Sequence, residues 1–229
     1  YCCSVTLSFM SKRLLSQRAF ELPETKETVL AVDIGTNAEI ALSCKGEISV
    51  CSAPAGPAFE GAQISQGMRG EPGAIAGMHI ARQSGNILLE AIPDDRRNVY
   101  PVRGICGSGL IDSIASLRQS DILQPDGYLL CDPEEADRLG IPRYLRERIT
   151  EKGFLVYLDP GGQQVCLTQK DIRQFQLAKA AVQAGIRMLL EQKGLALQQV
   201  DRIYIAGVFG GHISKKSAVL TGLFPDIAP

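Results

Sequence analysis

Two short segments of this sequence combine an apolar run with a glycine-containing end, and both could bind an anion. Residues 30–37 read LAVDIGTN, and residues 203–211 read IYIAGVFGG. In each segment the apolar run has the composition of a buried strand. The end of such a strand can present backbone N–H groups and one or two polar side chains to a charged ligand. The two segments together predict half of a nucleotide site.

The polar end of the first segment carries groups suited to a phosphate and its metal ion. The carboxylate of Asp33 could hold a hydrated Mg²⁺, which prefers carboxylates, waters and phosphate oxygens as ligands. Gly35 would let the backbone approach a phosphate closely, and Thr36 and Asn37 offer hydrogen-bond donors to its oxygens. The alternative is a tight β-turn, because all four residue types are frequent in turns.

The end of the second segment is built from glycines. Gly207, Gly210 and Gly211 carry no side chain that would obstruct a flat ring, which suits an adenosine stacked on the backbone. The alternative is close packing of a strand against a helix. Neither segment matches the fingerprint of a P-loop or of a Rossmann dinucleotide site, so both of those sites are disfavoured.

A third glycine segment, GICGSG at residues 104–109, precedes a run with helical periodicity. A helix N-terminus attracts anions, so Gly107, Ser108 and Gly109 are candidates for the same site, with Ser108 as the expected N-cap. The alternative is an ordinary helix cap. Of the two histidines, His79 is expected to be structural, whereas His212 follows the second segment and could line the site.

The composition excludes several classes of function. The chain has 229 residues, of which 45% are hydrophobic and 21% are charged, and its net charge is −1. Without a run of Lys or Arg, binding to nucleic acid is not expected, and no apolar stretch is long enough to cross a membrane. The seven cysteines have no CxxC pair and no zinc or iron–sulfur spacing, and no secretory signal is visible, which indicates a cytoplasmic protein with reduced thiols.

Periodicity and turn residues predict an α/β layer architecture, a mixed sheet with helices on its faces. Three consecutive antiparallel strands are expected first, and a hairpin, two long helices and a strand should follow. The expected elements are strands Val29–Ile34, Glu39–Ser43 and Ile48–Ser52, a short helix Ala58–Met68, hairpin strands Ala74–Arg82 and Asn86–Ile92, a helix from Gly107, a strand Phe154–Leu158, a helix over residues 168–193, a strand Val200–Ala206 and a helix Ser214–Leu223. A further helix is expected within residues 4–17.

These segments occur in an order that resembles a known family. The matching stretches are VDIGTNAEIAL, CSAPAGPAFEGAQISQGMRG, RGICGSGLIDSIASL, LTQKDIRQFQLAKAAVQAGI and IYIAGVFGGHI, followed by GLFPD. Together they resemble the C-terminal actin-like (ASKHA) ATPase domain of reductive activators of corrinoid proteins. That family belongs to the superfamily of sugar kinases, heat-shock chaperones and actin, whose lobes have a ribonuclease H-like fold.

The resemblance implies how the glycine segments would be used. In the superfamily two lobes clamp ATP and Mg²⁺ in a cleft. Asp33–Asn37 would be the second phosphate loop, and Gly207–Gly211 would be the adenosine loop. Gly107–Gly109 and Lys179, the latter on a helix flanking the nucleoside, would add to the cleft. Residues 29–229 would form the C-terminal lobe, and residues 1–28 would be a helix and linker from the lobe junction.

The resemblance also implies a function for the whole protein. It would use ATP to return an inactive Co(II) corrinoid protein to Co(I), with electrons from a [2Fe–2S] centre in an N-terminal domain outside this sequence. The sequence departs from the family at Ala38, where Gly is usual, and at Gly211 and His212, where Asn-Tyr is usual. A kinase lobe of the same superfamily and a non-catalytic partner-binding lobe remain alternatives. An exposed half-cleft would favour a homo-oligomer.

Overall fold

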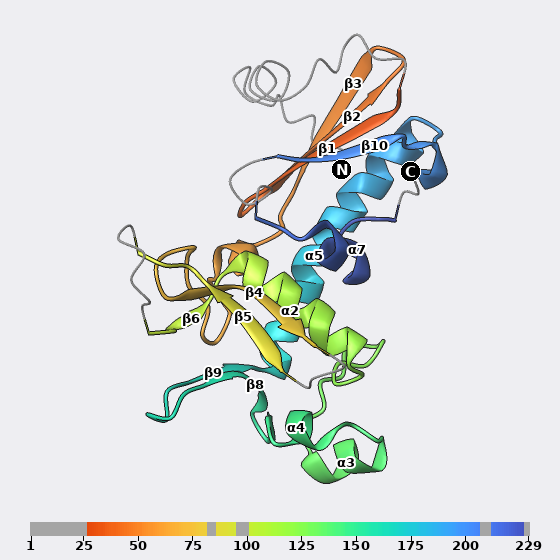
Figure 1. The fold of residues 1–229 in the computed structure, drawn as a ribbon. Coiled ribbons are helices and arrows are strands. Elements are labelled where there is room, and N and C mark those ends of the chain that lie inside the picture. The colour runs from red at the N-terminus through yellow and green to blue at the C-terminus, as the bar shows by residue number, and fades with distance from the viewer. Residues whose placement is uncertain (1–26, 82–85, 95–100, 207–211, 227–229) are drawn as a thin grey trace.

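The computed structural model describes residues 27–81, 86–94, 101–206 and 212–226. Figure 1 shows two α/β units stacked on one another, with the first and last described strands in the upper unit and the middle of the chain in the lower one. The expected helix within residues 4–17 lies outside the described residues. The layered α/β arrangement with mixed sheets is the one that the sequence predicts.

The upper unit contains a four-stranded sheet in the order β10-β1-β2-β3. Strands β1 (Val29–Ile34), β2 (Ala38–Cys44) and β3 (Glu47–Ala53) are consecutive and antiparallel, which confirms the predicted meander. Lys45 and Gly46, between β2 and β3, both have positive φ angles, 51° and 79°. This is the geometry of a two-residue hairpin turn.

The fourth strand of this sheet comes from the other end of the chain. β10 (Arg202–Ala206) pairs with β1 in parallel, so the carboxyl ends of the two strands meet at one edge of the sheet. The two strand ends predicted to share a site, more than 160 residues apart, are therefore neighbours. This contact depends on tertiary structure alone, since no local pattern links the two strands.

One face of the sheet is covered by the longest helix, α5 (Gln169–Gln192). Its N-cap, Thr168, forms the predicted capping box with Asp171. The predicted apolar stripe is buried throughout: Phe175, Ala178, Val182, Ile186 and Leu189. At Gly185 the helix comes so close that a Cβ would stand 2.6 Å from Ile40 Cδ1 of β2.

Asp171 also joins α5 to a distant loop. Its side chain is fully buried, and its carboxylate accepts hydrogen bonds from the backbone N–H of Ser65 (2.7 Å) and the Ser65 hydroxyl (3.0 Å). It accepts two more from the N–H and hydroxyl of Thr168. A buried carboxylate is tolerated when it is fully hydrogen-bonded in this way. The loop that follows β3 is therefore fixed to the start of α5.

The lower unit contains a second sheet, in the order β5-β4-β6. β4 (Ala74–Ile80) and β5 (Ile87–Ala91) form the predicted hairpin, and β6 (Gly104–Ile105) pairs with β4 in parallel. Helix α2 (Gly107–Gln119) packs on β4 with the predicted residues Leu110, Ile114 and Leu117 buried.

Two local expectations are wrong. The N-cap of α2 is Cys106, not Ser108, because Cys106 is the residue with an extended backbone immediately before the helix. The Ser108 side chain is buried, and its hydroxyl shares a hydrogen bond of 3.3 Å with the Cys106 thiol. The helix expected at 58–68 is only the 3-10 turn η2 (Pro57–Glu60). Gly61 ends it in the left-handed conformation, at φ 81°.

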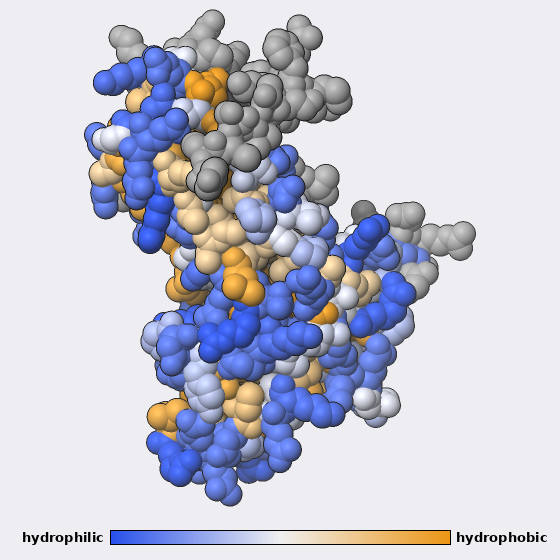
Figure 2. Space-filling model, turned by 180° about the vertical axis from the view of Figure 1, so that it is seen from behind, coloured by the Kyte–Doolittle hydropathy of each residue, from blue (hydrophilic) through white to orange (hydrophobic). Residues whose placement is uncertain are grey.

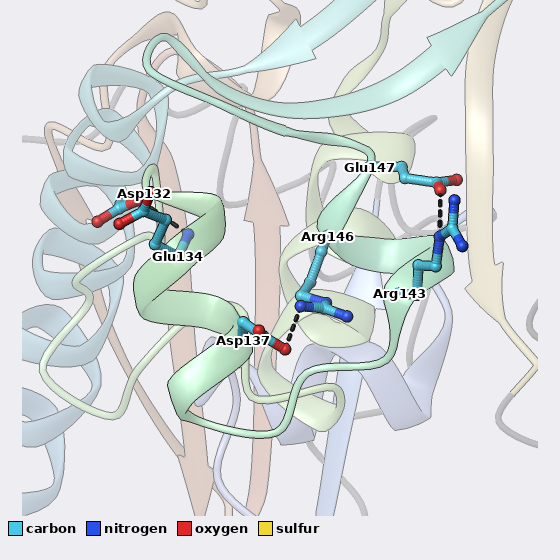
Figure 3. Close-up of polar contacts among 6 residues, drawn as sticks. All are labelled: Asp132, Glu134, Asp137, Arg143, Arg146 and Glu147. Atoms are coloured by element: carbon cyan, nitrogen blue, oxygen red, sulfur yellow. Dashed lines mark hydrogen bonds and ion pairs between the residues drawn. The ribbon is translucent and has the colours of Figure 1, made fainter.

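The polar stretch near residue 140 folds into short elements that no pattern in the sequence predicts. α3 (Pro133–Arg138), capped by the Asp132 side chain on the Glu134 N–H, packs beside α4 (Arg143–Arg146) (Figure 3). Arg146 forms an ion pair with Asp137. A third sheet, β7 (Ile149–Thr150), β8 (Gly153–Leu158) and β9 (Gln164–Leu167), follows; β8 is the predicted strand.

The remaining described elements are short. The 3-10 turn η3 (Leu197–Gln199) leads into β10, and α7 (Lys215–Leu220), capped by Ser214, lies within the predicted range Ser214–Leu223. Seen from behind, hydrophilic residues cover most of the lower part of the surface (Figure 2). No described helix has the length and apolar composition that crossing a membrane requires.

Candidate nucleotide site

A row of four residues crosses the upper sheet at the edge where β1 and β10 end. Ala206 of β10 pairs with Asp33 of β1, Asp33 pairs with Glu39 of β2, and Glu39 pairs with Ser52 of β3. Directly paired residues of neighbouring antiparallel strands place their side chains on the same face. Asp33 and Glu39 are therefore two carboxylates side by side. Glu39 is not among the residues singled out in the sequence.

The surroundings of Glu39 leave part of its carboxylate without a partner. The Ser52 hydroxyl donates to Glu39 Oε1 at 3.0 Å. Oε2 is shielded from solvent and has no hydrogen-bond partner among the described residues. Like charges directly opposite one another destabilise a sheet, and an unpaired buried oxygen costs further free energy. A cation bound beside the pair would relieve the first of these costs.

The donor set of this edge fits Mg²⁺ rather than a transition metal. Carboxylate oxygens are the hard ligands that Mg²⁺ prefers, and the ion keeps several waters and phosphate oxygens around it. Among the described residues, no three His, Cys, Asp or Glu side chains are grouped as a closed metal site needs. The arrangement suits an ion that arrives with a phosphate ligand.

The turn between β1 and β2 is ordered by contacts within the chain. The N–H of Gly35 donates to the Asn37 carbonyl at 3.0 Å, and the Thr36 carbonyl accepts from Gly56 at 2.8 Å. The Thr36 hydroxyl donates to Glu60 Oε1 of η2 at 2.8 Å. The hydroxyl predicted to contact a phosphate thus has a carboxylate partner here, and a phosphate oxygen would replace Glu60 as its acceptor.

Gly35 differs from the packing glycines of this fold. Its φ lies outside the left-handed range, and a Cβ there would meet nothing closer than Asn37 O at 3.6 Å and Glu60 Oε1 at 3.7 Å. Those are ordinary van der Waals distances, so the fold itself has no need of glycine at this position. A ligand that approaches the backbone closely requires a position without a side chain. Gly35 is such a position, and packing does not explain it.

Gly109, in contrast, has a packing reason. A Cβ at this position would stand 2.1 Å from the Ile75 carbonyl oxygen of β4. Ser108 and Gly109 lie in the buried contact between α2 and the second sheet, and Gly107 is buried as well. Gly109 therefore has a packing role at the start of this helix, and the contribution of the third segment to the nucleotide cleft stays a prediction.

Lys179 has a structural contact of its own. Its Nζ donates to the Thr221 carbonyl at 3.0 Å, and the neighbouring Gln183 donates to the carbonyls of Gly222 and Leu223. The two α5 side chains thereby bind the carbonyls that follow α7. Lys179 lines a cavity of about 270 Å³ between α2, α5 and α7.

The predicted adenosine residues Gly207, Gly210 and Gly211 lie outside the described residues. Their flanks are described: Ala206 is the cross-strand neighbour of Asp33, and His212 lines a cavity of about 470 Å³. Of the two residues that flank these glycines, Ala206 therefore lies in the carboxylate row and His212 at this cavity. His212 lines the cavity together with His79, which is exposed and not part of the core.

The cavity contains further residues that the sequence does not single out. Asp112 and Ser116 of α2 and Glu90 of β5 line it, together with Ser217 of α7. Burial and the nearby Glu90 carboxylate raise the pKa of Asp112, while hydrogen bonds from Ser217 and the Met78 backbone act in the opposite direction. These residues come from three elements far apart in the sequence, so no local pattern identifies them.

A family model described as the C-terminal domain of RACo, the ASKHA domain, matches residues 27–229. The chain belongs to this family. The match spans all of the described fold, and it confirms the resemblance to the ASKHA domain of corrinoid activators. Membership of this RACo family agrees with the actin-like α/β fold of the chain.

Individual relatives of this RACo-type domain are longer proteins. RamQ of Eubacterium limosum, a corrinoid activation enzyme, is 36% identical over 215 residues, which cover 90% of this chain and 34% of that protein. A Co(II) methylated amine-specific corrinoid protein reductase of Methanosarcina barkeri is 27% identical over 88% of this chain and 36% of its own length. The chain spans about a third of these relatives.

A solved structure agrees with these relatives. The structure of a reductive activator for a corrinoid, iron-sulfur protein superimposes with a TM-score of 0.73 at 36% identity, covering 90% of this chain and 31% of that one. At this identity the similarity concerns the family as well as the fold. The RACo-type domain described here is therefore comparable with one part of that longer activator.

Proposed function

We propose that this chain is the nucleotide-binding lobe of an ATP-dependent activator that returns Co(II) corrinoid protein to Co(I). The observation that carries the proposal is the pair of carboxylates Asp33 and Glu39 at the edge where β1 and β10 end. The pair stands beside Gly35, a glycine that the fold itself does not require. Membership of the ASKHA family and the names of the relatives support the rest.

In this proposal the turn after β1 binds the phosphates of ATP. Asp33 and Glu39 would hold Mg²⁺ through its waters, and the ion would neutralise phosphate charge. Gly35 would admit the phosphate to the backbone, and Thr36 and Asn37 would donate hydrogen bonds to its oxygens. Gly207, Gly210 and Gly211 would support the adenosine. Transfer of a phosphate to water also needs donors from a second lobe. Charge arranged in advance on both sides of the phosphate stabilises the transition state of phosphoryl transfer.

The corrinoid protein is the proposed partner, and the reduction is a one-electron step at its cobalt. The electron would come from a [2Fe–2S] centre in another part of the protein, since this chain has no cysteine spacing for one. ATP can drive this reduction only if it binds two conformations of the activator with different affinities. A cytoplasmic location is part of the proposal and agrees with five free cysteines in the described residues.

The test follows cobalt directly. The full-length protein that carries this sequence is mixed with Co(II) corrinoid protein, a reductant and Mg–ATP, and Co(I) is followed by its absorbance. Asp33→Asn should lower the ATP-dependent rate at least about tenfold, equal to roughly 1.4 kcal/mol of transition-state stabilisation. Asp121→Asn, an exposed Asp at the end of α2, is the matched control.

The same experiment separates the alternatives. A Co(I) rate that does not depend on ATP, or that Asp33→Asn leaves unchanged, would contradict the proposal. A kinase lobe would instead transfer phosphate to a small acceptor without any corrinoid. A non-catalytic lobe would bind the partner protein equally well with and without nucleotide.

A further inference from the structure

The outer face of α5, which points away from the upper sheet, carries an exposed apolar stripe. Leu177 and Met188 are 66% and 51% exposed, and Ala180 and Ala184 between them are exposed as well. Successive members of this group are three or four positions apart, so all four lie on one side of the helix. The residues that α5 buries against the sheet lie on its opposite side. Contiguous apolar side chains on a surface are typical of a contact with another protein chain.

Two opposite charges flank the stripe. Arg173 lies one turn before Leu177, and Glu191 lies about one turn after Met188. Both are exposed, and neither has an ion-pair partner among the described residues. The Arg173 guanidinium donates a hydrogen bond to the Gln176 side chain at 2.7 Å. Arg173 and Glu191 cannot meet within one copy, because residues 18 positions apart are separated by about 27 Å along a helix.

The outer face of α5 is complementary to a second copy of itself. Its chemical pattern is nearly symmetric about position 182, so an antiparallel copy of the helix places matching groups at the same level. A two-fold axis forms each of these contacts twice. The pairs brought together are Ala180 with Ala184, Leu177 with Met188, and Arg173 with Glu191. Two small residues at the crossing point allow the helices to approach closely.

We infer that the outer face of α5 is the contact surface between two copies of this chain, packed as antiparallel helices around a two-fold axis. The occupant is a second copy because this one arrangement covers the apolar stripe and also gives Arg173 and Glu191 partners of opposite charge. A contact made by one helix from each copy falls near or below the lower end of stable interfaces, roughly 1,200 Å², so the dimer should form reversibly. The inference is independent of the proposed nucleotide function.

Reversal of single charges tests the inference. In sedimentation velocity at low ionic strength, the 229-residue chain should convert from monomer to dimer between about 10 and 200 μM. Arg173→Glu and Glu191→Arg should each weaken the dimer about tenfold, because both symmetric contacts then join like charges. Both positions are exposed, so the fold should be unaffected. The matched control is Lys152→Glu, an exposed charge in the turn between β7 and β8, which should leave the dimer unchanged.

Two rescues identify the antiparallel register. The double variant Arg173→Glu/Glu191→Arg pairs opposite charges again. An equimolar mixture of the two single variants does so as well, because one chain then has Glu at both positions and the other has Arg. Both should restore the wild-type affinity to within about threefold.

Three results would overturn the inference. The first is a wild-type chain that stays monomeric up to about 200 μM, the upper end of the range expected for such an interface. The second is a dimer that both single variants leave unchanged, since the copies would then meet through another surface. The third is a dimer that the single variants weaken but neither rescue restores, since Arg173 would then not face Glu191 of the second copy.

Discussion

Asp33 and Glu39 face each other across β1 and β2, at the end of the sheet where β10 also ends. Two carboxylates in direct cross-strand positions repel each other, and this repulsion has no favourable structural effect within the sheet. The turn after β1 sets this pairing, because Asp33 and Glu39 lie equally far before and after Thr36 in the sequence. In the proposed function, the cation that accompanies a phosphate would offset this repulsion.

This repulsion predicts an unusual effect of removing charge. In EDTA, Asp33→Asn should raise the free energy of unfolding by about 0.2–1 kcal/mol, since the like-charge pair disappears and Asn suits the strand end. Urea denaturation at low ionic strength measures it, and added salt should reduce the gain because salt screens exposed charges. A clear loss of stability in EDTA would mean that the carboxylate has a structural role.

The two kinds of glycine should respond differently to alanine. Gly35→Ala should change stability by less than about 0.5 kcal/mol, because nothing is closer than 3.6 Å to the new methyl group. The affinity of the Gly35→Ala protein for nucleotide should nevertheless fall about tenfold. Gly109→Ala should destabilise by about 1–3 kcal/mol, because the methyl group would overlap the Ile75 carbonyl. Thermal unfolding and a nucleotide titration on both variants test this; a strongly destabilised Gly35→Ala protein would identify Gly35 as a packing residue.

Asp171 is expected to be the most sensitive polar residue of the core. Asp171→Ala leaves the buried donors of Ser65 and Thr168 without an acceptor and should cost roughly 3 kcal/mol, in line with 1–3 kcal/mol for each orphaned buried group. Asp132→Ala, which removes only the exposed cap of α3, should cost about 1 kcal/mol. Urea denaturation of both variants gives the comparison, and equal losses would show that the buried network adds nothing beyond a cap.

Asp112 should make stability depend on pH. Its raised pKa means that the folded state binds a proton at higher pH than the unfolded state, whose Asp pKa is about 4. The contribution of Asp112 to the free energy of unfolding therefore falls as pH rises from about 4 through the raised folded pKa. The groups facing it are Glu90 of β5, His79 of β4, and His212 and Lys216 beside α7.

Comparison with Asp112→Asn isolates this effect from the other titrating groups. The difference in unfolding free energy, wild type minus variant, should decrease between about pH 4 and pH 7. Urea denaturation at three pH values in that range is sufficient. A difference that stays constant, or that increases with pH, would show that Asp112 ionises as freely in the folded chain as in the unfolded one.

The sequence predicted the elements with strong local signals. The capping box at Thr168 and the stripe on α5 were correct because each is set within a few turns of helix. The prediction of Ser108 as the N-cap was wrong because the cap position depends on the backbone angles of a single residue. A glycine-rich sequence does not determine those angles. The helix at 58–68 failed because Gly61 adopts a left-handed conformation that ends it.

The site was only partly predictable. The turn Asp33–Asn37 was recognisable from residue types, and Glu39 could have been found from the same turn, since a tight turn fixes which residues pair across it. Asp112 and His79 could not, because they approach His212 only through the packing of α2, α7 and the second sheet. Gly109 shows that a glycine with a packing role can resemble part of a ligand loop in sequence.

The isolated chain should bind Mg–ATP weakly and hydrolyse it negligibly, because the second half of the cleft supplies donors that this lobe lacks. Measurable hydrolysis that Asp33→Ala abolishes would contradict this expectation. Weak binding is still measurable, because a ligand that binds only the folded state raises its unfolding temperature in proportion to the logarithm of its excess over Kd.

The most direct measurement is therefore the unfolding temperature of the 229-residue chain with millimolar ATP, with and without Mg²⁺, in the wild type, Asp33→Asn, Glu39→Gln and the control Asp121→Asn. The carboxylate pair predicts that ATP stabilises the wild type and the control more with Mg²⁺ than without it. It also predicts that either carboxylate substitution removes the Mg²⁺-dependent part. Equal stabilisation of all four proteins, or none in the wild type, would contradict a Mg–ATP site at Asp33 and Glu39.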